Sequence, residues 1–386
     1  MPVVAGLVWV DGSAERGEGG PKTSDARNHE ILARVQSDDE DCRVRAAIEI
    51  RLLTKASSKH REELAEAIEP LVEMLRLGAR HCRVAALLAL LNLAVKNERN
   101  KAKIVDAGAL EPLTGFLQST DTALLEHATA AILTLSAASI NKPRIGTAGA
   151  LPPLVNVLSN GNRQARVDAV LALYNLSTVP GNLAILLSVK PVPPLVDLLK
   201  SCRKSSKTAE KCCALLESLL NFDEGRTALT AEEGGVLALV EALEEGSLQG
   251  REHAVGALLT MCESDRRRYR EVILGEGVVP GLLELTAEGT PKSRSQAHAL
   301  LKLLRDSPDQ RTELKAETLE TIVCSIVSQV DSEECGEKAV KMLAEMVQVS
   351  MEQSLRHLQK RASTCTTPSK LAAPLRGCPP HEVPSK

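Results

Sequence analysis

The chain has 386 residues, of which 44% are hydrophobic but only 1% are aromatic. Its 47 basic and 50 acidic residues leave a net charge of −3, so no global positive field draws the protein onto nucleic acid. The scarcity of aromatic side chains also removes the stacking surfaces that single-stranded nucleic acid needs. A core of leucine, alanine and valine suits thin helices packed in layers, not a large enzyme domain filled with aromatic side chains.

The N-terminal segment has the composition of a disordered region. Five of the ten residues from 11 to 20 are Gly or Ser. The apolar run at 3–10 is too short to span a membrane and lacks the basic region and cleavage site of a signal peptide. We predict a mostly disordered N-terminal segment over 1–40, a helical solenoid over 41–350, and a mostly disordered tail over 351–386.

One apolar segment recurs along the chain, as in Leu110-Glu-Pro-Leu-Thr-Gly-Phe-Leu117 and Leu151-Pro-Pro-Leu-Val-Asn-Val-Leu158. Its central aliphatic residue, the anchor, recurs at intervals of 40 to 44 residues, a period typical of helical solenoids. The anchors are Leu71, Leu113, Leu154, Leu195, Leu239, Leu282 and Ile322. A leading half-unit at 41–54 matches only the last helix of a unit, which predicts about seven units with the first one partial.

Each unit is predicted to hold three helices. A glycine five residues before the anchor ends a short first helix, because glycine adopts the left-handed conformation without strain; these are Gly108, Gly149, Gly234 and Gly277. A proline next to the anchor opens the second helix, where its missing N–H costs nothing, as at Pro112, Pro153 and Pro194. The third helix is the longest and is predicted at 84–94, 125–136, 165–177, 209–220, 251–261 and 295–304. No segment alternates with the two-residue period of a strand, so the fold is predicted to be all-α.

The repeat units resemble those of a known family. Asp106-Ala-Gly-Ala-Leu-Glu-Pro-Leu113 and the third-helix ends Leu90-Leu-Asn-Leu-Ala94 and Leu173-Tyr-Asn-Leu-Ser177 resemble armadillo repeats. Ala287-Glu-Gly-Thr-Pro-Lys-Ser-Arg294 is similar to the terminal repeat of plant U-box proteins. The resemblance implies a right-handed superhelical solenoid of about seven three-helix armadillo repeats. About forty residues precede the first repeat, without a hydrophobic-Pro docking signature, so we expect the U-box and its ligase activity to be absent.

The resemblance also implies where a partner binds. Armadillo superhelices hold extended segments along a groove lined by third helices, where an Asn amide near the helix end can bond a ligand backbone. The aligned positions are Asn92, Thr134, Asn175, Ser218, Thr260 and Lys302. His127, Lys211 and His253 lie seven residues earlier on nearly the same face and are further candidates. The alternative is that these side chains only bond neighbouring turns.

Nuclear import adaptors of this fold place a Trp four residues before the groove Asn. Here Leu88 precedes Asn92 and Leu171 precedes Asn175, which disfavours binding of import signals. Two basic clusters are solvated surface or sites for an acidic partner or phosphates: Lys200, Arg203, Lys204 and Lys207, and Arg266, Arg267, Arg268 and Arg270.

Patterns for catalysis and metal binding are missing from the sequence. The ten cysteines form no CxxC pair and have no His at ligand spacing, which predicts reduced structural thiols, no metal site and a cytoplasmic or nuclear location. There is no phosphate-binding glycine loop, HExxH or GxSxG motif. Glu126-His127 and Glu252-His253 occupy one place in two units, so they indicate a repeat consensus and not a catalytic pair. We predict no catalytic residues and no cofactor.

The sequence thus predicts a non-catalytic scaffold that binds an extended segment of another protein, and the resemblance to U-box proteins implies a place in the ubiquitin pathway. The alternatives are the substrate-recognition part of a U-box ubiquitin ligase system acting with a partner in trans, and a nuclear transport adaptor. No nucleic acid, membrane span or small-molecule substrate is expected. The sequence leaves the client protein, the biological process and the oligomeric state open.

Overall fold

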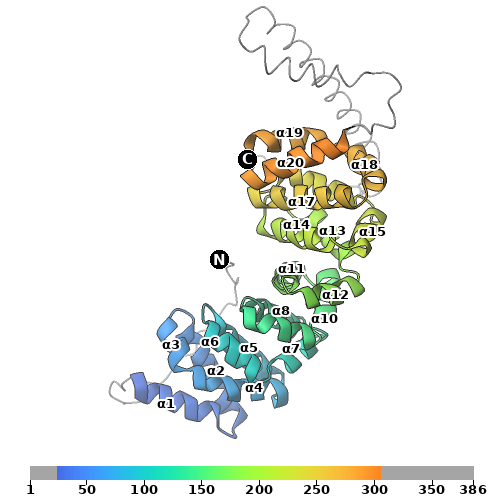
Figure 1. Cartoon of the computed structure of the whole chain (residues 1–386). Coiled ribbons are helices and arrows are strands. Elements are labelled where there is room, and N and C mark those ends of the chain that lie inside the picture. Colours follow the sequence, from blue (N-terminus) through green and yellow to red (C-terminus); the bar gives the residue numbers. More distant parts are fainter. Residues whose placement is uncertain (1–23, 306–386) are drawn as a thin grey trace, which may run out of the picture. The chain divides into compact units, whose positions relative to one another are not determined.

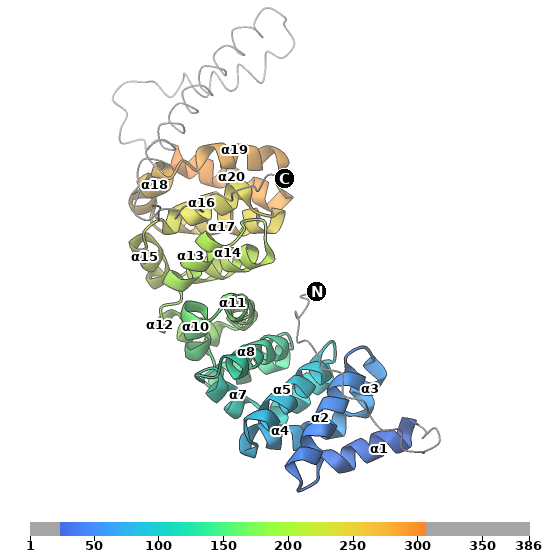
Figure 2. The same cartoon turned by 180° about the vertical axis from the view of Figure 1, so that it is seen from behind.

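The computed structural model describes residues 24–305 (Figures 1 and 2); residues 1–23 and 306–386, with the predicted anchor Ile322 and the tail, lie outside that part. All regular elements in the described residues are helices. These residues form two compact units: unit 1 comprises 24–203 and 207–229, and unit 2 comprises 204–206 and 230–305.

The predicted third helices are all present. They are α2 (Glu40–Thr54), α5 (Arg80–Ala94), α8 (Thr122–Ser136), α11 (Arg163–Ser177), α14 (Lys207–Leu219), α17 (Leu248–Ser264) and α20 (Pro291–Leu304). In unit 1, α2, α5, α8, α11 and α14 pack on one another in that order, and in unit 2, α17 packs on α20 (Figure 1). This sequential packing of one helix per repeat is the solenoid arrangement, and it confirms the all-α repeat fold.

The first and second helices complete each repeat. The second helices are α4 (Ile68–Leu77), α7 (Leu110–Phe116), α10 (Leu151–Asn160), α13 (Val192–Ser201), α16 (Gly235–Glu245) and α19 (Val279–Glu288). The first helices are α3 (Ser58–Glu63) with η1 (Ala65–Ala67), α6 (Glu98–Asp106), η2 (Ser139–Asn141) with α9 (Lys142–Thr147), α12 (Pro180–Ser188), α15 (Asp223–Ala231) and α18 (Arg266–Gly275). Each second helix packs against the third helix of its own repeat.

Local sequence explains where these helices begin and end. Asp121 and Asn162 cap α8 and α11, because their side chains accept hydrogen bonds from main-chain N–H groups that the first turn leaves unpaired. The predicted glycines between first and second helices all have positive φ, from 65° to 82°. The prediction that glycine ends the first helix is therefore confirmed.

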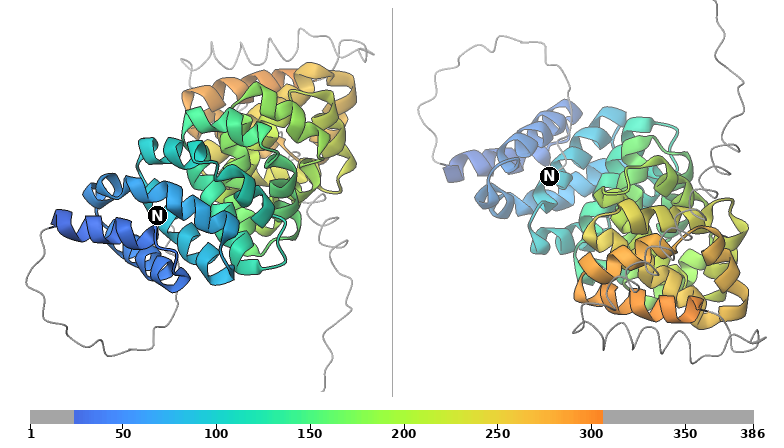
Figure 3. Two further views of the ribbon diagram at one scale, coloured as in Figure 1. Left: turned by 90° about the horizontal axis from the view of Figure 1, so that it is seen from below. Right: turned by 90° about the horizontal axis from the view of Figure 1, so that it is seen from above.

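A helix that the sequence did not predict precedes the first repeat. Helix α1 (Ser24–Val35) packs on α2 (Figure 3), although residues 1–40 were expected to be mostly disordered and α2 to have no helix ahead of it. Ile31 and Val35 of α1 are fully buried. Helix α1 thus covers apolar surface of α2 that would otherwise face water, as expected at the end of a repeat array.

The core is aliphatic, as the composition predicts. In α11, Ala169 and Leu173 are fully buried one turn apart, and in α10 Leu154 and Leu158 are fully buried as well. Burying a leucine side chain contributes about 2 kcal/mol, and the small alanines let the helix axes approach closely.

Three buried asparagines connect successive first helices of unit 1. We call Asn100, Asn141 and Asn182 the first-helix asparagines. Asn141 Nδ2 donates to the Lys101 carbonyl at 3.0 Å, in the preceding repeat, and to the Leu135 carbonyl at 3.2 Å, at the end of α8. The other two asparagines make the same pair of bonds, to Arg61 and Leu93 and to Lys142 and Leu176. One amide group thereby bonds two carbonyl groups of the preceding repeat and fixes how two repeats stack.

Within residues 24–305 no single helix has both the length and the apolar composition to cross a membrane, although two sharply bent pairs of consecutive helices meet that test together.

Candidate functional site

Four of the predicted binding residues lie at equivalent places in unit 1. We call Asn92 on α5, Thr134 on α8, Asn175 on α11 and Ser218 on α14 the third-helix ladder. All four are partly exposed. Because their helices pack consecutively, the four side chains form one row across neighbouring repeats. Thr260 on α17 is also partly exposed and Lys302 on α20 is exposed, and both belong to unit 2.

The two ladder asparagines also bridge repeats. Asn92 Nδ2 donates to the Arg51 carbonyl at the end of α2, at 2.8 Å, and Asn175 Nδ2 donates to Ser136 Oγ at the end of α8, at 3.1 Å. Each bond uses one amide N–H. Among the described residues, the second N–H and Oδ1 of each amide have no partner, so they are available to a peptide group.

The two hydroxyl residues of the third-helix ladder, and Thr260 of unit 2, already donate hydrogen bonds within their own helices. Thr134 donates to the Ala130 carbonyl at 2.8 Å, Ser218 to Ala214 at 3.1 Å and Thr260 to Gly256 at 2.9 Å. These bonds are the intrahelical type that partly buried Ser and Thr often make. The oxygen of each hydroxyl can still accept a hydrogen bond, so these positions differ chemically from the two asparagines.

The candidates seven residues earlier have distinct environments. Burial lowers the pKa of His127, and the nearby Arg51 lowers it further while Glu126 opposes the shift, so the imidazole is neutral at pH 7. Lys211 Nζ lies 4.1 Å from the centre of the Tyr174 ring and 3.3 Å from Glu210. His253 of unit 2 is partly exposed on α17. His127 and Lys211 thus differ in charge although they occupy equivalent positions.

The repeated Glu-His sequences serve the repeat architecture. Glu126 accepts a hydrogen bond from Asn162, the residue that caps α11. Glu252 accepts from Thr290 Oγ1 at 2.6 Å, and Thr290 caps α20. In both repeats the glutamate carboxylate accepts a hydrogen bond from the residue that caps the next third helix. This shared structural role supports the interpretation of the two Glu-His sequences as a repeat consensus.

The basic clusters are largely engaged within the protein. Lys204 lies 3.2 Å from Glu241 and Lys207 lies 3.0 Å from Glu210. Arg266 donates to the carbonyls of Leu303 and Arg305, and Arg270 donates to that of Leu304 at 2.9 Å. These two arginines therefore cap the C-terminal end of α20, where cations are favoured by the helix dipole.

One group of side chains with metal-ligating atoms was not anticipated from sequence spacing. Glu40, His81 and Cys82 bring one ligand atom each within 4.8 Å of one another. Cys82 Sγ and the Ala79 N–H both donate to Glu40 Oε1, at 2.9 Å each. Burial, with the adjacent Glu40 carboxylate, raises the pKa of Cys82 to about 11. The arrangement joins the starts of two helices, where the dipoles disfavour a cation, and the carboxylate serves as a cap.

Cys82 is therefore expected to resist alkylation in the folded protein. With a pKa raised from 9.0 to about 11, it has about a hundredfold less thiolate at neutral pH, and it is fully buried. Time-resolved iodoacetamide labelling with peptide mass spectrometry should show Cys82 reacting far more slowly than the partly exposed Cys42. In urea the two should react at similar rates; equal rates in the folded protein would contradict the burial of Cys82.

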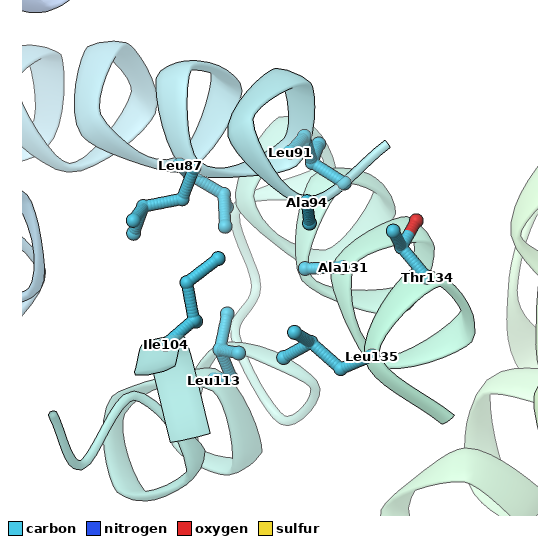
Figure 4. A pocket seen from close by; sticks show the side chains of 9 residues that line it. Leu87, Leu91, Ala94, Ile104, Leu113, Ala131, Thr134 and Leu135 are labelled. Carbon is cyan, nitrogen blue, oxygen red and sulfur yellow. The ribbon is translucent and has the colours of Figure 1, made fainter. Parts of the chain in front are cut away.

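A small apolar cavity of about 10 Å³ lies beneath the ladder in unit 1, where α5, α6, α7 and α8 meet (Figure 4). Leu87, Ile104, Leu113 and Leu135 point toward it, and Thr134 borders it. This volume is at the lower limit for one water molecule, and the lining is apolar. The cavity is a packing gap and not a ligand site.

Comparison with known proteins agrees with the repeat geometry. Residues 145–324 match the plant U-box protein ARM repeat region, and residues 97–137 match the armadillo/beta-catenin-like repeat. The chain is 39% identical over 102 residues to U-box domain-containing protein 25 of Arabidopsis thaliana, which is 26% of this chain and 24% of that protein. It is 32% identical over 97 residues to U-box domain-containing protein 45 of the same plant, covering 25% of this chain and 12% of the relative.

The matched segments thus span a quarter or less of these curated relatives. Among solved structures, the crystal structure of an engineered protein is similar with a TM-score of 0.64 at 20% identity, covering 90% of this chain and 85% of that one. That likeness shows the fold. Together with the helical repeats described above, these matches show an armadillo-repeat fold whose repeats are similar to the armadillo region of plant U-box proteins.

Proposed function

We propose that this protein is a non-catalytic scaffold that binds an extended segment of another protein along the third-helix ladder of unit 1. The observation that carries the proposal is the row of partly exposed polar side chains at one position of α5, α8, α11 and α14. Asn92 and Asn175 each keep an amide N–H and an oxygen that no described residue uses. An amide with both groups can bond a peptide group whatever the ligand's side chains are.

The spacing of the ladder fits a ligand that lies across the helices. Asn92 and Asn175 are separated by the Thr134 position on α8. A bound backbone would therefore meet an amide, a hydroxyl and an amide in turn. The partly exposed Leu88 and Leu171, one turn before the asparagines, offer aliphatic contact beside them. This surface favours apolar side chains over the lysines that import adaptors take.

The experiment compares the full chain with the double variant Asn92→Ala/Asn175→Ala in affinity purification with mass spectrometry. Each amide-to-peptide bond contributes about 1 kcal/mol, so partners held by both asparagines should bind roughly thirtyfold more weakly and drop out of the purified set. Circular dichroism would confirm equal helix content.

The matched control is Asn156→Ala, which removes an exposed asparagine on α10, away from the ladder. This variant should keep the partners of the unmodified chain. If both variants keep the same partners, the ladder is not the binding surface for them.

We further propose that the scaffold acts in the ubiquitin pathway, in the cytoplasm or nucleus, together with a ligase supplied in trans. The support is the match of residues 145–324 to the ARM region of plant U-box proteins. Co-purification of a U-box or RING protein would support this proposal. If that ligase is lost in the double variant Asn92→Ala/Asn175→Ala, the ligase itself binds the ladder. If it is retained while other partners are lost, the ladder binds the substrate of the ligase. Purified sets without any ligase would contradict this proposal and leave the ladder proposal intact.

A further inference from the structure

Successive repeats are joined by ion pairs at one recurring place. Arg166, at the start of α11, lies 2.5 Å from Asp197 on the second helix of the next repeat. Arg251, at the start of α17, lies 3.0 Å from Glu284 in the same way. In both pairs the arginine stands twelve residues after its anchor, and the carboxylate stands two residues after the next anchor.

Each of these arginines also closes its own second helix. Arg166 Nε donates to the Leu158 carbonyl at 2.9 Å, and Arg251 Nε donates to the Leu243 carbonyl at 2.8 Å. A planar guanidinium can make both contacts at once, because its donors point along two edges. The arginine–carboxylate ion pair is therefore a recurring feature of these two repeats, with one carboxylate at a fixed position.

The same place in an earlier repeat has an arginine but no carboxylate. Arg83 stands twelve residues after the anchor Leu71, and two residues after the anchor Leu113 the chain has Gly115. Arg83 forms no ion pair with any residue from 24 to 305, and its Nε is buried without a hydrogen-bond partner. Arg83 Nη2 donates to the Arg76 carbonyl at 3.5 Å, and the guanidinium lies 5.7 Å from the centre of the Phe116 ring.

The missing carboxylate leaves an open hollow beside Arg83. The hollow has a volume of about 560 Å³, and its lining includes Arg83, Glu111, Pro112, Gly115 and Phe116. A Cβ atom on Gly115 would meet no atom within 4 Å. The space that Asp197 and Glu284 fill in the other repeats is thus empty of protein atoms at this one.

We propose that the Arg83 hollow binds an Asp or Glu side chain of a partner protein, which takes the place of the carboxylate that Gly115 lacks. Arg83 then gains the ion pair that Arg166 and Arg251 have within the chain. Pro112 and Phe116 provide apolar walls for the stem of the incoming side chain. Arg76 also lines the hollow, but its guanidinium donates to the carbonyls of Ala107 and Gly108, so Arg83 is the arginine that faces the ligand without an acidic partner. One such arginine beside the exposed Glu111 suits a singly charged carboxylate better than a doubly charged phosphate, so the occupant is an acidic side chain and not a phosphorylated one. This surface is separate from the third-helix ladder and does not depend on it.

Two variants of equal size test the geometry without a ligand. Gly115→Glu restores a carboxylate at the place of Asp197 and Glu284, and Gly115→Gln fills the same space without charge. Gly115→Glu should melt at a higher temperature than Gly115→Gln, and the difference should vanish when Arg83→Gln is added to both. A difference that is absent, or that persists without Arg83, would overturn the proposed geometry.

Selection from a library of random peptides displayed on phage tests the occupant. The full chain should enrich peptides that carry Asp or Glu between apolar residues, and Arg83→Gln and Gly115→Glu should both lose them. Asn92→Ala/Asn175→Ala should keep them, which separates this surface from the ladder. In fluorescence polarisation, replacing the acidic residue of a selected peptide by Gln or Asn should weaken binding about tenfold to a hundredfold. The proposal is wrong if no acidic peptides are enriched, if Gly115→Glu keeps them, or if a phosphoserine version binds more tightly.

Discussion

The Asn141→Ala variant should lose about 3 kcal/mol of unfolding free energy, measured by urea titration and followed by circular dichroism. Asn141 is fully buried, and its amide donates to the carbonyls of Lys101 and Leu135. Alanine removes two hydrogen bonds between repeats, each contributing about 1 kcal/mol, and leaves the volume of the buried amide unfilled, which costs about 1 kcal/mol more. Both carbonyls belong to the repeat before that of Asn141, so the variant should also unfold over a wider range of urea as neighbouring repeats uncouple.

The control for this prediction is Asn156→Ala. Asn156 is exposed on α10, and its Oδ1 accepts only from the exposed Asn160, at 2.8 Å. This change should alter the unfolding free energy by less than about 0.5 kcal/mol. A similarly small effect of Asn141→Ala would mean that water or a shifted side chain replaces the buried amide, and that the first-helix asparagines do not hold the repeats together.

The third helices were predictable because burial and periodicity coincide in them. The predicted range 165–177 and the observed α11 (Arg163–Ser177) share their C-terminal residue, and so do 125–136 and α8 (Thr122–Ser136). The starts were missed by two residues in α11, which begins with the polar Arg163 and Gln164, and by three in α8, which begins Thr122-Ala123-Leu124. Apolar periodicity alone does not locate the first turn of a helix. A cap such as Asn162 marks the true start, and only the structure distinguishes it from a loop residue.

The first-helix asparagines were not predictable from hydrophobicity. Asn100 and Asn141 stand in polar segments and Asn182 stands beside an apolar one, and nothing in a single asparagine shows that it is buried. The available signal was their recurrence every 41 residues, in register with the anchors. Repeat alignment reveals this kind of residue because its partners are main-chain groups, which leave no trace of their own in the sequence.

In the candidate site, too, the positions of the residues could be predicted from the sequence but their contacts could not. The ladder positions on α5, α8, α11 and α14 follow from repeat alignment. The alignment could not show that Asn92 already donates one N–H to the Arg51 carbonyl in the preceding repeat. Only the other N–H and the amide oxygen of Asn92 are therefore left for a ligand. The contact of Cys82 with Glu40 was missed for a similar reason, because the two residues meet only when α2 and α5 pack.

The Gly146→Ala variant should destabilise the protein by about 2 kcal/mol, although Gly→Ala inside a helix ordinarily stabilises by up to about 1 kcal/mol. A Cβ atom on Gly146 of α9 would lie 1.8 Å from Asn182 Oδ1 and 2.6 Å from its Cγ. The amide of Asn182 cannot move aside cheaply, since it donates to the carbonyls of Lys142 and Leu176 at 3.1 and 3.0 Å. The added methyl group therefore breaks the two hydrogen bonds that join this repeat to the previous one.

A double-mutant cycle separates this mechanism from general strain in α9. In the Asn182→Ala background the obstructing amide is gone, so Gly146→Ala should become neutral or slightly stabilising, which gives an interaction energy of about 2 kcal/mol or more. Gly115→Ala on α7 is the matched control, because a Cβ there meets no atom within 4 Å and should stabilise in both backgrounds. An equal cost of Gly146→Ala with and without Asn182 would show that α9 itself rejects alanine. If Gly146→Ala is costly only when Asn182 is present, the glycine in one repeat is required by the asparagine in the next.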